Sequence, residues 1–321
     1  MHHLLSSSFF LGSLQLTNRL IQGPLAGFSC APFRELFYQF TPPAYCVTEM
    51  ISAHDVVHKH TLRSRYLYRS SKEQKLCYQI AGHEPAIMAQ AAVCLEQTGA
   101  DLIDINCGCP KTKIRKKGAG SALLENPEQL FNIINAVRQA ISIPLTVKIR
   151  IDGTTDDFNR AKMIEDAGAD ALIVHGRHWT ESYDPPCNLE QVAQIKHLLT
   201  IPVIANGDIS DCLSLNNVLM KTGCDAYMIS RAGTGKPWLY HHLIHEGEKT
   251  ITLAQQISLF MQHVQGLASL ENHYKAVLQS KSLVRFYFKN QLDKSDLYDF
   301  YQLNCLNAIE NFLLTKVIQN T

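Results

Sequence analysis

The sequence predicts an α/β fold: a (β/α)8 TIM barrel followed by a small all-helical C-terminal domain. Segments of β character recur about every 25 to 45 residues with helical patterns between them, which is typical of parallel βαβ units. There are about eight such segments, the number that closes this kind of barrel. From about Ile251 onward the strand signals stop and the pattern becomes helical.

Two recurring signals mark where the strands begin. A glycine follows an amphipathic stretch in Thr98-Gly99-Ala100-Asp101, Ala167-Gly168-Ala169-Asp170 and Thr222-Gly223-Cys224-Asp225. Glycine ends a helix well because it enters the left-handed region without a Cβ clash. Proline opens two further segments, after Ile143 and after Ile201, as it can at the first residue of a strand. The expected strands span residues 19–25, 45–50, 76–81, 102–106, 145–150, 171–175, 203–206 and 226–230.

The C-terminal part is expected to be helical because apolar residues such as Ile257 and Val264 share one helix face. The polar segment 246–250 separates it from the last strand. We therefore expect a catalytic barrel over residues 1–248 and a helical domain over residues 249–321.

Charge and cysteine content bound the class of protein. Thirty Lys and Arg against 29 Asp and Glu give a formal net charge of +1, so that no global field draws in polyanions and any nucleic-acid site must be local. The 10 cysteines stand mostly inside apolar runs, as reduced structural thiols do. With no signal-peptide pattern and no apolar run of roughly 18 residues, we expect a cytoplasmic protein without a membrane span.

Polar or charged side chains end nearly every expected strand. They are Glu49, Gln79, Asn106, Cys109, Lys148, His175, Arg177, Asn206, Asp208 and Arg231. In a barrel of this type the active site lies at the C-terminal ends of the strands. We therefore expect these side chains to surround one site.

Cys107 and Cys109 flank a glycine at the end of the fourth strand. A Cys-x-Cys pair without a second pair lacks the ligands of a structural zinc site. Cys107 is expected to pack passively, whereas Gly108 and Pro110 form a tight turn that points Cys109 into the barrel mouth. Beside the basic run that follows, the residues alone leave nucleophile, metal ligand and acid open for Cys109.

Lys148 lies at the polar end of an apolar strand, where it either snorkels to the barrel rim or faces an electron-rich ligand. After the last strands, the Arg231 side chain and the N–H groups of Gly207 and Arg231 suit a phosphate, which such barrels commonly hold there. Together these features suggest FMN, although sugar phosphates use similar sites. Gly118-Ala119-Gly120-Ser121 follows a loop and not a strand, so no dinucleotide motif is expected.

Two basic segments follow expected strands. Residues 58–69 interleave cationic side chains with tyrosines, and residues 111–117 hold four lysines and an arginine. Cations neutralise phosphates and aromatic rings stack on bases, so both segments suit RNA on the catalytic rim. The alternative for each segment is a solvated charged face.

Motifs along the chain, from about Leu20 to Trp238, resemble those of the tRNA-dihydrouridine synthases. They are Pro24-Leu25-Ala26-Gly27, Thr48-Glu49-Met50, Asp104-Ile105-Asn106-Cys107-Gly108-Cys109-Pro110, Val147-Lys148-Ile149-Arg150, Val174-His175-Gly176-Arg177, Ile204-Ala205-Asn206-Gly207-Asp208 and Ser230-Arg231. The resemblance implies an FMN-bearing barrel and a helical tRNA-binding domain that reduce the C5=C6 bond of a D-loop uridine. It also implies that NADPH reduces the flavin, that the flavin passes hydride to C6, and that Cys109 delivers a proton to C5.

The resemblance also implies roles for individual positions. Residues implied to hold FMN are Pro24, Leu25, Ala26, Gln79, Lys148, His175, Asn206, Gly207, Asp208, Ser230 and Arg231. Residues implied to contact the RNA or its flipped uracil are Glu49, Asn106, Arg177, Lys111, Lys113, Arg115 and Lys116. The sequence departs from the family pattern in Gln79-Ile80-Ala81-Gly82, at Cys107 and in Ser230-Arg231-Ala232, where the serine slightly crowds the phosphate.

Two other functions fit part of this pattern. The first is an FMN-dependent ene-reductase or dehydrogenase of a free small molecule, such as a dihydropyrimidine, which shares the barrel, the lysine and the cysteine. This function does not account for the basic segments or the helical tail. A catalytically silent RNA-binding barrel is the second. For the favoured function, the simplest expectation is a monomer that binds tRNA, with no protein partner and no membrane.

Overall fold

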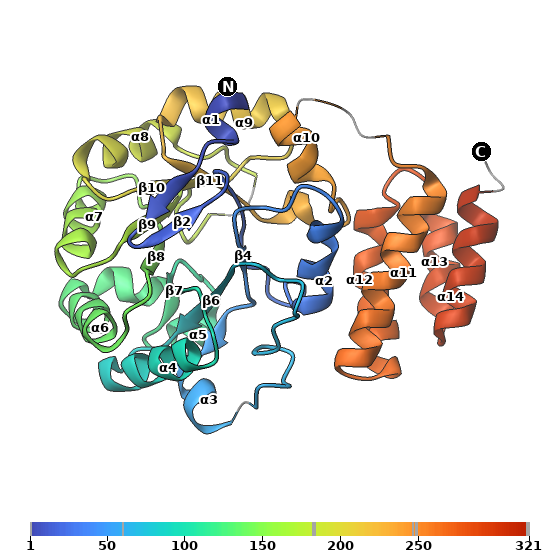
Figure 1. Ribbon diagram of the computed structural model, residues 1–321, viewed down its shortest axis with the longest axis horizontal. Helices are drawn as coiled ribbons and strands as arrows, with labels where there is room; N and C mark the ends of the chain where they lie inside the picture. Colours follow the sequence, from blue (N-terminus) through green and yellow to red (C-terminus); the bar gives the residue numbers. More distant parts are fainter. Residues whose placement is uncertain (1, 60, 182–183, 246, 248–249, 319–321) are drawn as a thin grey trace.

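The structure, a computed structural model, describes residues 2–59, 61–181, 184–245, 247 and 250–318 (Figure 1). Its centre is a parallel sheet with the strand order β4-β3-β11-β10-β9-β8-β7-β6-β5. The strands are β3 (Leu20–Gln22), β4 (Cys46–Val47), β5 (Ile51–Ser52), β6 (Leu76–Ala81), β7 (Leu102–Cys107), β8 (Leu145–Arg150), β9 (Ala171–His175), β10 (Val203–Asn206) and β11 (Ala226–Ile229). Because β4 also pairs with β6, the sheet closes into a barrel, as the sequence predicts.

Helices connect the strands around the outside of the barrel (Figure 1). They are α2 (Ala31–Glu35), α3 (Ala53–His58), α4 (Pro85–Gln97), α5 (Thr112–Arg115), α6 (Pro127–Ala140), α7 (Asp156–Asp166), α8 (Leu189–Leu198), α9 (Cys212–Thr222) and α10 (Leu239–His245). The glycines expected to end helices, Gly99, Gly168 and Gly223, all have positive φ. The bounds of β6, β8, β9 and β10 are those that the sequence predicts.

The second strand of the barrel is interrupted, where the sequence analysis expected one continuous strand. β4 and β5 both run parallel to β6, with Cys46 opposite Leu76 and Ile51 opposite Ile80. Five steps of chain therefore span four steps of β6, which defines a bulge. Glu49 lies within it, at the C-terminal rim of the barrel.

An N-terminal hairpin of β1 (Phe9–Leu11) and β2 (Leu14–Leu16) was not expected from the sequence. Its buried Leu11 and Leu16 form one cluster with inward residues such as Leu102 and Ala226, the first residues of their strands. The hairpin thus closes the N-terminal end of the barrel. A ligand site is therefore expected at the opposite end, where the carboxyl ends of the strands lie.

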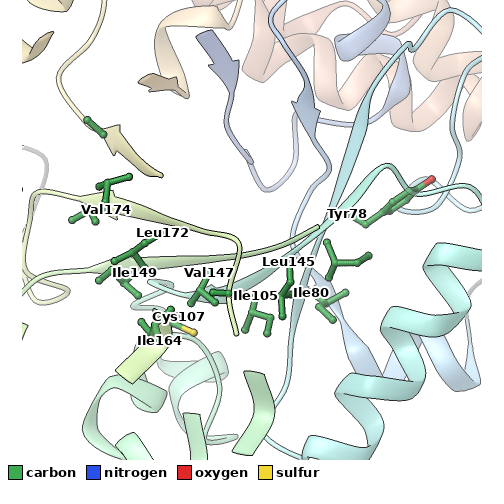
Figure 2. Close-up of a cluster of buried hydrophobic side chains, with 14 of the residues drawn as sticks. Tyr78, Ile80, Ile105, Cys107, Leu145, Val147, Ile149, Ile164, Leu172 and Val174 are labelled. Atoms are coloured by element: carbon green, nitrogen blue, oxygen red, sulfur yellow. The ribbon is translucent and has the colours of Figure 1, made fainter. Parts of the chain in front are cut away.

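Strand residues alternate between two environments. Tyr78, Ile105, Val147 and Val174 face the surrounding helices and form the main core (Figure 2). Cys107 lies in this core and is 0% exposed, as expected for a passively packed thiol (Figure 2). The residues between them in sequence point into the barrel, because successive strand side chains face opposite sides.

Four helices follow the barrel and stand beside it, next to α2 (Figure 1). They are α11 (Leu253–Leu270), α12 (His273–Tyr287), α13 (Lys294–Gln302) and α14 (Leu306–Leu313), and a π-helical turn (Leu314–Ile318) ends the described chain. Phe260, Leu283 and Phe300 belong to a separate hydrophobic cluster that these helices share. The expected boundary between residues 248 and 249 lies outside the described residues.

The helical unit contacts the barrel at several points. Cys30 and Leu36 beside α2 join its hydrophobic cluster, and Phe28 meets Phe286 edge-on with ring centroids 5.6 Å apart. A Cβ at Gly266 would lie 2.8 Å from Pro32, so α11 passes very close to the barrel. None of the helices in the described part of the chain combines the length and apolarity needed to cross a membrane.

Candidate active site at the carboxyl end of the barrel

The inward side chains nearest the C-terminal ends of the strands form the floor of the site. Gln79, Asn106, Lys148, His175 and Asn206 come from β6, β7, β8, β9 and β10, and each is 9% exposed or less. The strand register sets Asn106 beside Lys148 and His175 beside Asn206. The structure therefore brings together the side chains that the sequence assigns to one site.

Hydrogen bonds connect this floor to the loop after β7. Gln79 Nε2 donates to Asp104 Oδ2 over 2.7 Å, and Asn106 Nδ2 donates to Gln79 Oε1 over 2.9 Å. Asn106 Oδ1 in turn accepts from the backbone N–H groups of Gly108, at 3.2 Å, and Cys109, at 2.9 Å. Both amide side chains thus have defined partners within the protein.

The carbonyl group of Cys109 is also held. It accepts hydrogen bonds from the N–H and the hydroxyl of Ser121, both at 3.1 Å. Arg115 donates to the same hydroxyl over 2.9 Å and forms an ion pair with Glu125. The Cys109 side chain is partly exposed. Its turn is therefore fixed from both sides while the residue remains partly exposed.

Lys148 and Asp104 are buried groups of opposite charge in the same part of the barrel. Burial lowers the pKa of Lys148 to about 8, an effect that the Asp104 carboxylate opposes. Burial raises the pKa of Asp104 to about 6, against hydrogen bonds from Thr146 and Gln79 and the Lys148 charge. The two groups therefore favour each other's charged form against burial, in a poorly solvated part of the site.

His175 lies among cations. Burial, together with the charges of Lys148, Arg150, Arg177 and Arg231, lowers its pKa to about 2. The imidazole is therefore neutral at every pH at which the protein works, and it can offer one donor and one acceptor. The set of cations around it suits an anionic ligand.

Arg177 lies under the site and is 2% exposed. It donates to Pro185 O over 2.6 Å, to Cys187 Sγ over 3.1 Å, and forms an ion pair with Asp208. Asp208 adopts φ +54 and also accepts from the Cys187 N–H at 2.8 Å. In this structure Arg177 holds the loops after β9 and β10 together, and its contact with substrate stays a prediction.

The ends of β3 and β11 meet on the far side of the floor. Buried Gln22 donates from Nε2 to Gly23 O over 2.9 Å and to Ser230 O over 3.3 Å. A Cβ at Gly23 would come within 2.5 Å of Ser230 Oγ, so only glycine allows this approach. Arg231 follows as the first residue of a short 3-10 turn, with its side chain exposed.

The residues present fit the phosphate-bearing flavin that the sequence suggests. The loop after β10 carries Gly207 at φ +119, a conformation in which a Cβ would lie 2.3 Å from Cys187 Sγ. Its neighbours on the rim include the cations Lys148 and Arg231. Pro24, Leu25 and Ala26 follow β3 and are partly or fully exposed. Cofactor contacts of these residues stay predictions.

Glu49 is bound within the protein. It is 4% exposed, accepts from the Gly27 N–H at 2.7 Å, and pairs with Arg65 over 2.6 Å. Arg65 also pairs with Glu271 at the end of α11, again over 2.6 Å. This network joins the bulged strand to the helical unit. Contact of Glu49 with uracil stays a prediction.

The lysines of the second basic segment are exposed, including Lys111, Lys113 and Lys116. No hydrogen bond or ion pair with the described residues engages their ammonium groups. In the first segment, Arg65 and Arg69 are engaged with carboxylates, and His60 lies outside the described residues. Among the described residues, the second segment presents all of its lysines to solvent, whereas the exposed cations of the first include Lys59 and Arg63 beside its paired arginines.

Several residues of the site were not singled out from the sequence. Asp104 belonged to a recognised motif, and its position two residues before Asn106 on a strand could have placed it on the same inward face. Thr146 likewise lies two residues before Lys148 on a strand, which could have placed both side chains on the same inward face. Ser121 and Cys187 come from loops, where no periodicity predicts which way a side chain points.

Comparisons with known proteins agree with this architecture. The family model described as dihydrouridine synthase matches residues 21–311. The chain is 35% identical over 314 residues to tRNA-dihydrouridine synthase B of Shewanella oneidensis, covering 95% of this chain and 97% of the relative. It is 36% identical over 287 residues to tRNA-dihydrouridine synthase B of Escherichia coli, covering 87% and 89%.

Solved structures with low sequence identity share the barrel. A 2-naphthoyl-CoA reductase complex matches 77% of this chain and 53% of its own, with a TM-score of 0.60 and 12% identity. An old yellow enzyme homologue from Zymomonas mobilis matches 78% of this chain and 96% of its own, with a TM-score of 0.55 and 13% identity. At these identities the likeness concerns the fold alone.

Proposed function

The chain belongs to the dihydrouridine synthase family, and from this premise we propose that it reduces the C5=C6 bond of a D-loop uridine in tRNA, with Cys109 as the proton donor. The family match over residues 21–311 supports the reaction. The observation that carries the role of Cys109 is that this partly exposed residue stands on a turn fixed by Asn106 and Ser121, at the carboxyl end of the barrel.

FMN is the proposed cofactor and NADPH the proposed reductant. The residues that would hold FMN are Pro24, Leu25, Ala26, Gln79, Lys148, His175, Asn206, Gly207, Asp208, Ser230 and Arg231. When bound, FMN would supply the redox chemistry, the transfer of hydride between NADPH and C6 of the uracil. The cations around His175 support a site for its phosphate and its ring.

The protein's own groups would manage charge and protons. Reduction at C6 leaves negative charge on the uracil ring, and a proton delivered at C5 removes it. The Cys109 thiol is the donor that the site offers at its accessible edge. Lys148, whose charged form the Asp104 carboxylate supports against burial, would stabilise negative charge on the cofactor. Glu49 and Asn106 would order the site around the base.

The RNA must be held while the base leaves its stack. Lys111, Lys113, Lys116 and the helical unit, proposed as a domain over residues 249–321, would provide this grip. Arg115 is proposed as a substrate residue as well, although its ion pair with Glu125 also supports the Cys109 turn. We propose that the protein acts in the cytoplasm as a monomer.

The test compares Cys109→Ala with the parent on unmodified tRNA, with dihydrouridine measured by mass spectrometry. We expect a loss of roughly 100-fold or more in turnover, the size of a general-acid contribution, with tRNA affinity retained. Cys94→Ala, on α4, is the matched control and should turn over like the parent. Equal turnover of Cys109→Ala would contradict the acid role.

The same assay separates the rival function. A reductase of a free small molecule would oxidise NADPH as fast with free uracil or orotate as with tRNA. We expect the yellow protein to respond to tRNA only. Indifference to tRNA would overturn the proposed substrate and leave the barrel chemistry intact.

A further inference from the structure

Asp104 is a buried carboxylate without contact with solvent. It faces the barrel interior from the middle of β7 and is 0% exposed. Gln79 Nε2 donates to one oxygen over 2.7 Å and Thr146 Oγ1 donates to the other over 2.6 Å. Burying a carboxylate costs free energy that a passive core position would not require. The arrangement therefore calls for a role.

Gln79 and Asn106 continue from Asp104 as a chain of hydrogen bonds that ends at Cys109. Each amide has a nitrogen that only donates and an oxygen that only accepts. Gln79 gives its nitrogen to Asp104 and its oxygen to Asn106, and Asn106 gives its oxygen to the Cys109 N–H. All the bonds therefore point in one direction.

The direction is fixed independently at both ends. The Asp104 carboxyl group accepts at both oxygens, from Thr146 and from Gln79, so Gln79 turns its nitrogen toward Asp104. Backbone N–H groups can only donate, so Asn106 must turn its oxygen toward Gly108 and Cys109. Both requirements are met at once, because the nitrogen left on Asn106 donates to the oxygen left on Gln79. If either amide were rotated by half a turn, one of its hydrogen bonds would become a donor facing a donor and the other an acceptor facing an acceptor.

We propose that Asp104 is a positioning residue that sets the orientation of the Gln79 and Asn106 amides and, through them, the turn that presents Cys109. The importance of Cys109 rests on the proposed function, but the oriented chain does not. Asp104 touches neither substrate nor cofactor in this proposal. It determines which amide atoms of Gln79 and Asn106 are used in hydrogen bonds within the protein and which remain available to a ligand.

A pair of substitutions can reverse the chain. Asn106→Asp puts a second acceptor opposite Gln79, which can turn its nitrogen to only one of the two carboxylates. Adding Asp104→Asn lets Gln79 rotate, because the new amide can donate to Gln79 Oε1 and accept from Thr146. The two hydrogen bonds of Gln79 are then satisfied in the opposite direction, while Thr146 and the Cys109 N–H still donate. Asp104→Asn alone also keeps its bonds, since Thr146 Oγ1 lies 3.4 Å from Ile103 O and can donate there.

The first measurement is thermal melting of the purified full-length holoprotein at pH 8. We expect Asn106→Asp to lower the melting temperature by about 5 °C or more, as an unmet buried charge does. Asp104→Asn should lower it as well, because it keeps its hydrogen bonds but removes the carboxylate that offsets the buried Lys148 charge. The double variant should recover most of the loss. Additive losses in the double variant would overturn the oriented chain.

The second measurement follows the position of Cys109 without turnover. Iodoacetamide labelling, read by mass spectrometry with Cys94 as the reference within each sample, should change at Cys109 by about fivefold or more in Asn106→Asp. It should return to within about twofold of the parent in the double variant. Thr146→Val, which removes the other donor to Asp104, should leave labelling unchanged. If none of these substitutions changed the labelling of Cys109, the proposed link between the hydrogen-bonded chain and the position of Cys109 would be wrong.

The outcomes separate the two proposals. If Cys109→Ala turns over like the parent while the double variant restores melting and labelling, the acid role fails and the oriented chain stands. If the parent forms dihydrouridine and Cys109→Ala does not, but losses at positions 104 and 106 are additive, the function stands and the role of Asp104 fails.

Discussion

The two basic segments of the catalytic rim look alike in sequence and differ in structure. In residues 58–69, Arg65 pairs with Glu49 and Glu271, and Arg69 pairs with Asp101. In residues 111–117 the lysines are exposed, and the one arginine pairs with Glu125. The first segment uses its paired arginines to hold the protein together. The second leaves its lysines to face a polyanion.

The difference follows from side-chain chemistry as well as from position. The guanidinium group is planar, weakly hydrated and able to bind two carboxylates at once, which suits buried junctions. The ammonium group of lysine is compact and strongly hydrated, so an exposed lysine stays in solvent until a phosphate displaces its water. Which cations of a basic segment remain available to RNA therefore depends on the ion pairs that the fold gives them.

The largest expected effect is at Arg65. Arg65→Met would leave Glu49 and Glu271 without their shared cation, and both carboxylates are at most 10% exposed at the side chain. We expect a loss of about 3 to 5 kcal/mol in the free energy of unfolding. Burial alone would raise the pKa of Glu271, but hydrogen bonds from Lys275 and Arg65 hold it below its usual value. Chemical unfolding followed by fluorescence measures the loss.

Arg63→Met is the matched control for this substitution, because Arg63 is exposed in the same segment. It should change the free energy of unfolding by about 0.5 kcal/mol or less. If Arg65→Met were as stable as Arg63→Met, the first segment would be a solvated charged face. The contrast between the two segments would then disappear.

A smaller effect is expected at Arg115, which combines features of both segments. Arg115→Ala removes the donor to Ser121, which holds the carbonyl group of Cys109. We expect turnover to fall by about 10- to 100-fold, as misplacement of a reacting group does, while affinity for tRNA falls much less. Single-turnover dihydrouridine formation and tRNA binding measure the two quantities separately. If Arg115→Ala lost only affinity for tRNA, we would conclude that Arg115 contacts RNA as the neighbouring lysines are proposed to do.

The sequence predicted the barrel well because its strands repeat one local pattern. Apolar runs with polar ends located Gln79, Lys148 and His175, and proline and glycine marked where strands and helices begin or end. The bulge at Glu49 escaped because it depends on pairing between distant segments, which local periodicity does not contain. The N-terminal hairpin pairs locally, but each of its strands has only three residues, too few to give a clear alternation.

The partners of the charged residues escaped for the same reason. Arg65 meets Glu271 across 206 positions of sequence, so its neutralisation cannot be predicted from the composition of residues 58–69. Asp104 belongs to a motif recognised in the sequence, but its proposed role depends on Gln79, which lies on a neighbouring strand. Sequence patterns located the groups, and the fold determined which of them remain available to a ligand.

The smallest expected effects are those of single lysines in the second segment. Lys113→Ala and Lys116→Ala should each weaken tRNA binding by about threefold, the range of one exposed charge pair. Each should also reduce the dependence of log K on log salt by about 0.9, one released counterion per lost phosphate contact, with flavin content unchanged. Binding measured across a salt series tests both expectations.

Lys59→Ala gives this last prediction its control, because Lys59 is equally exposed but belongs to the first segment. If only the second segment holds RNA, the salt dependence of Lys59→Ala should equal that of the parent. An equal reduction for Lys59 would mean that both segments touch the backbone, with the first one carrying structural and RNA-binding cations side by side. No change for Lys113 and Lys116 would instead make the exposed lysines a solvated surface and leave the helical unit as the remaining grip on tRNA.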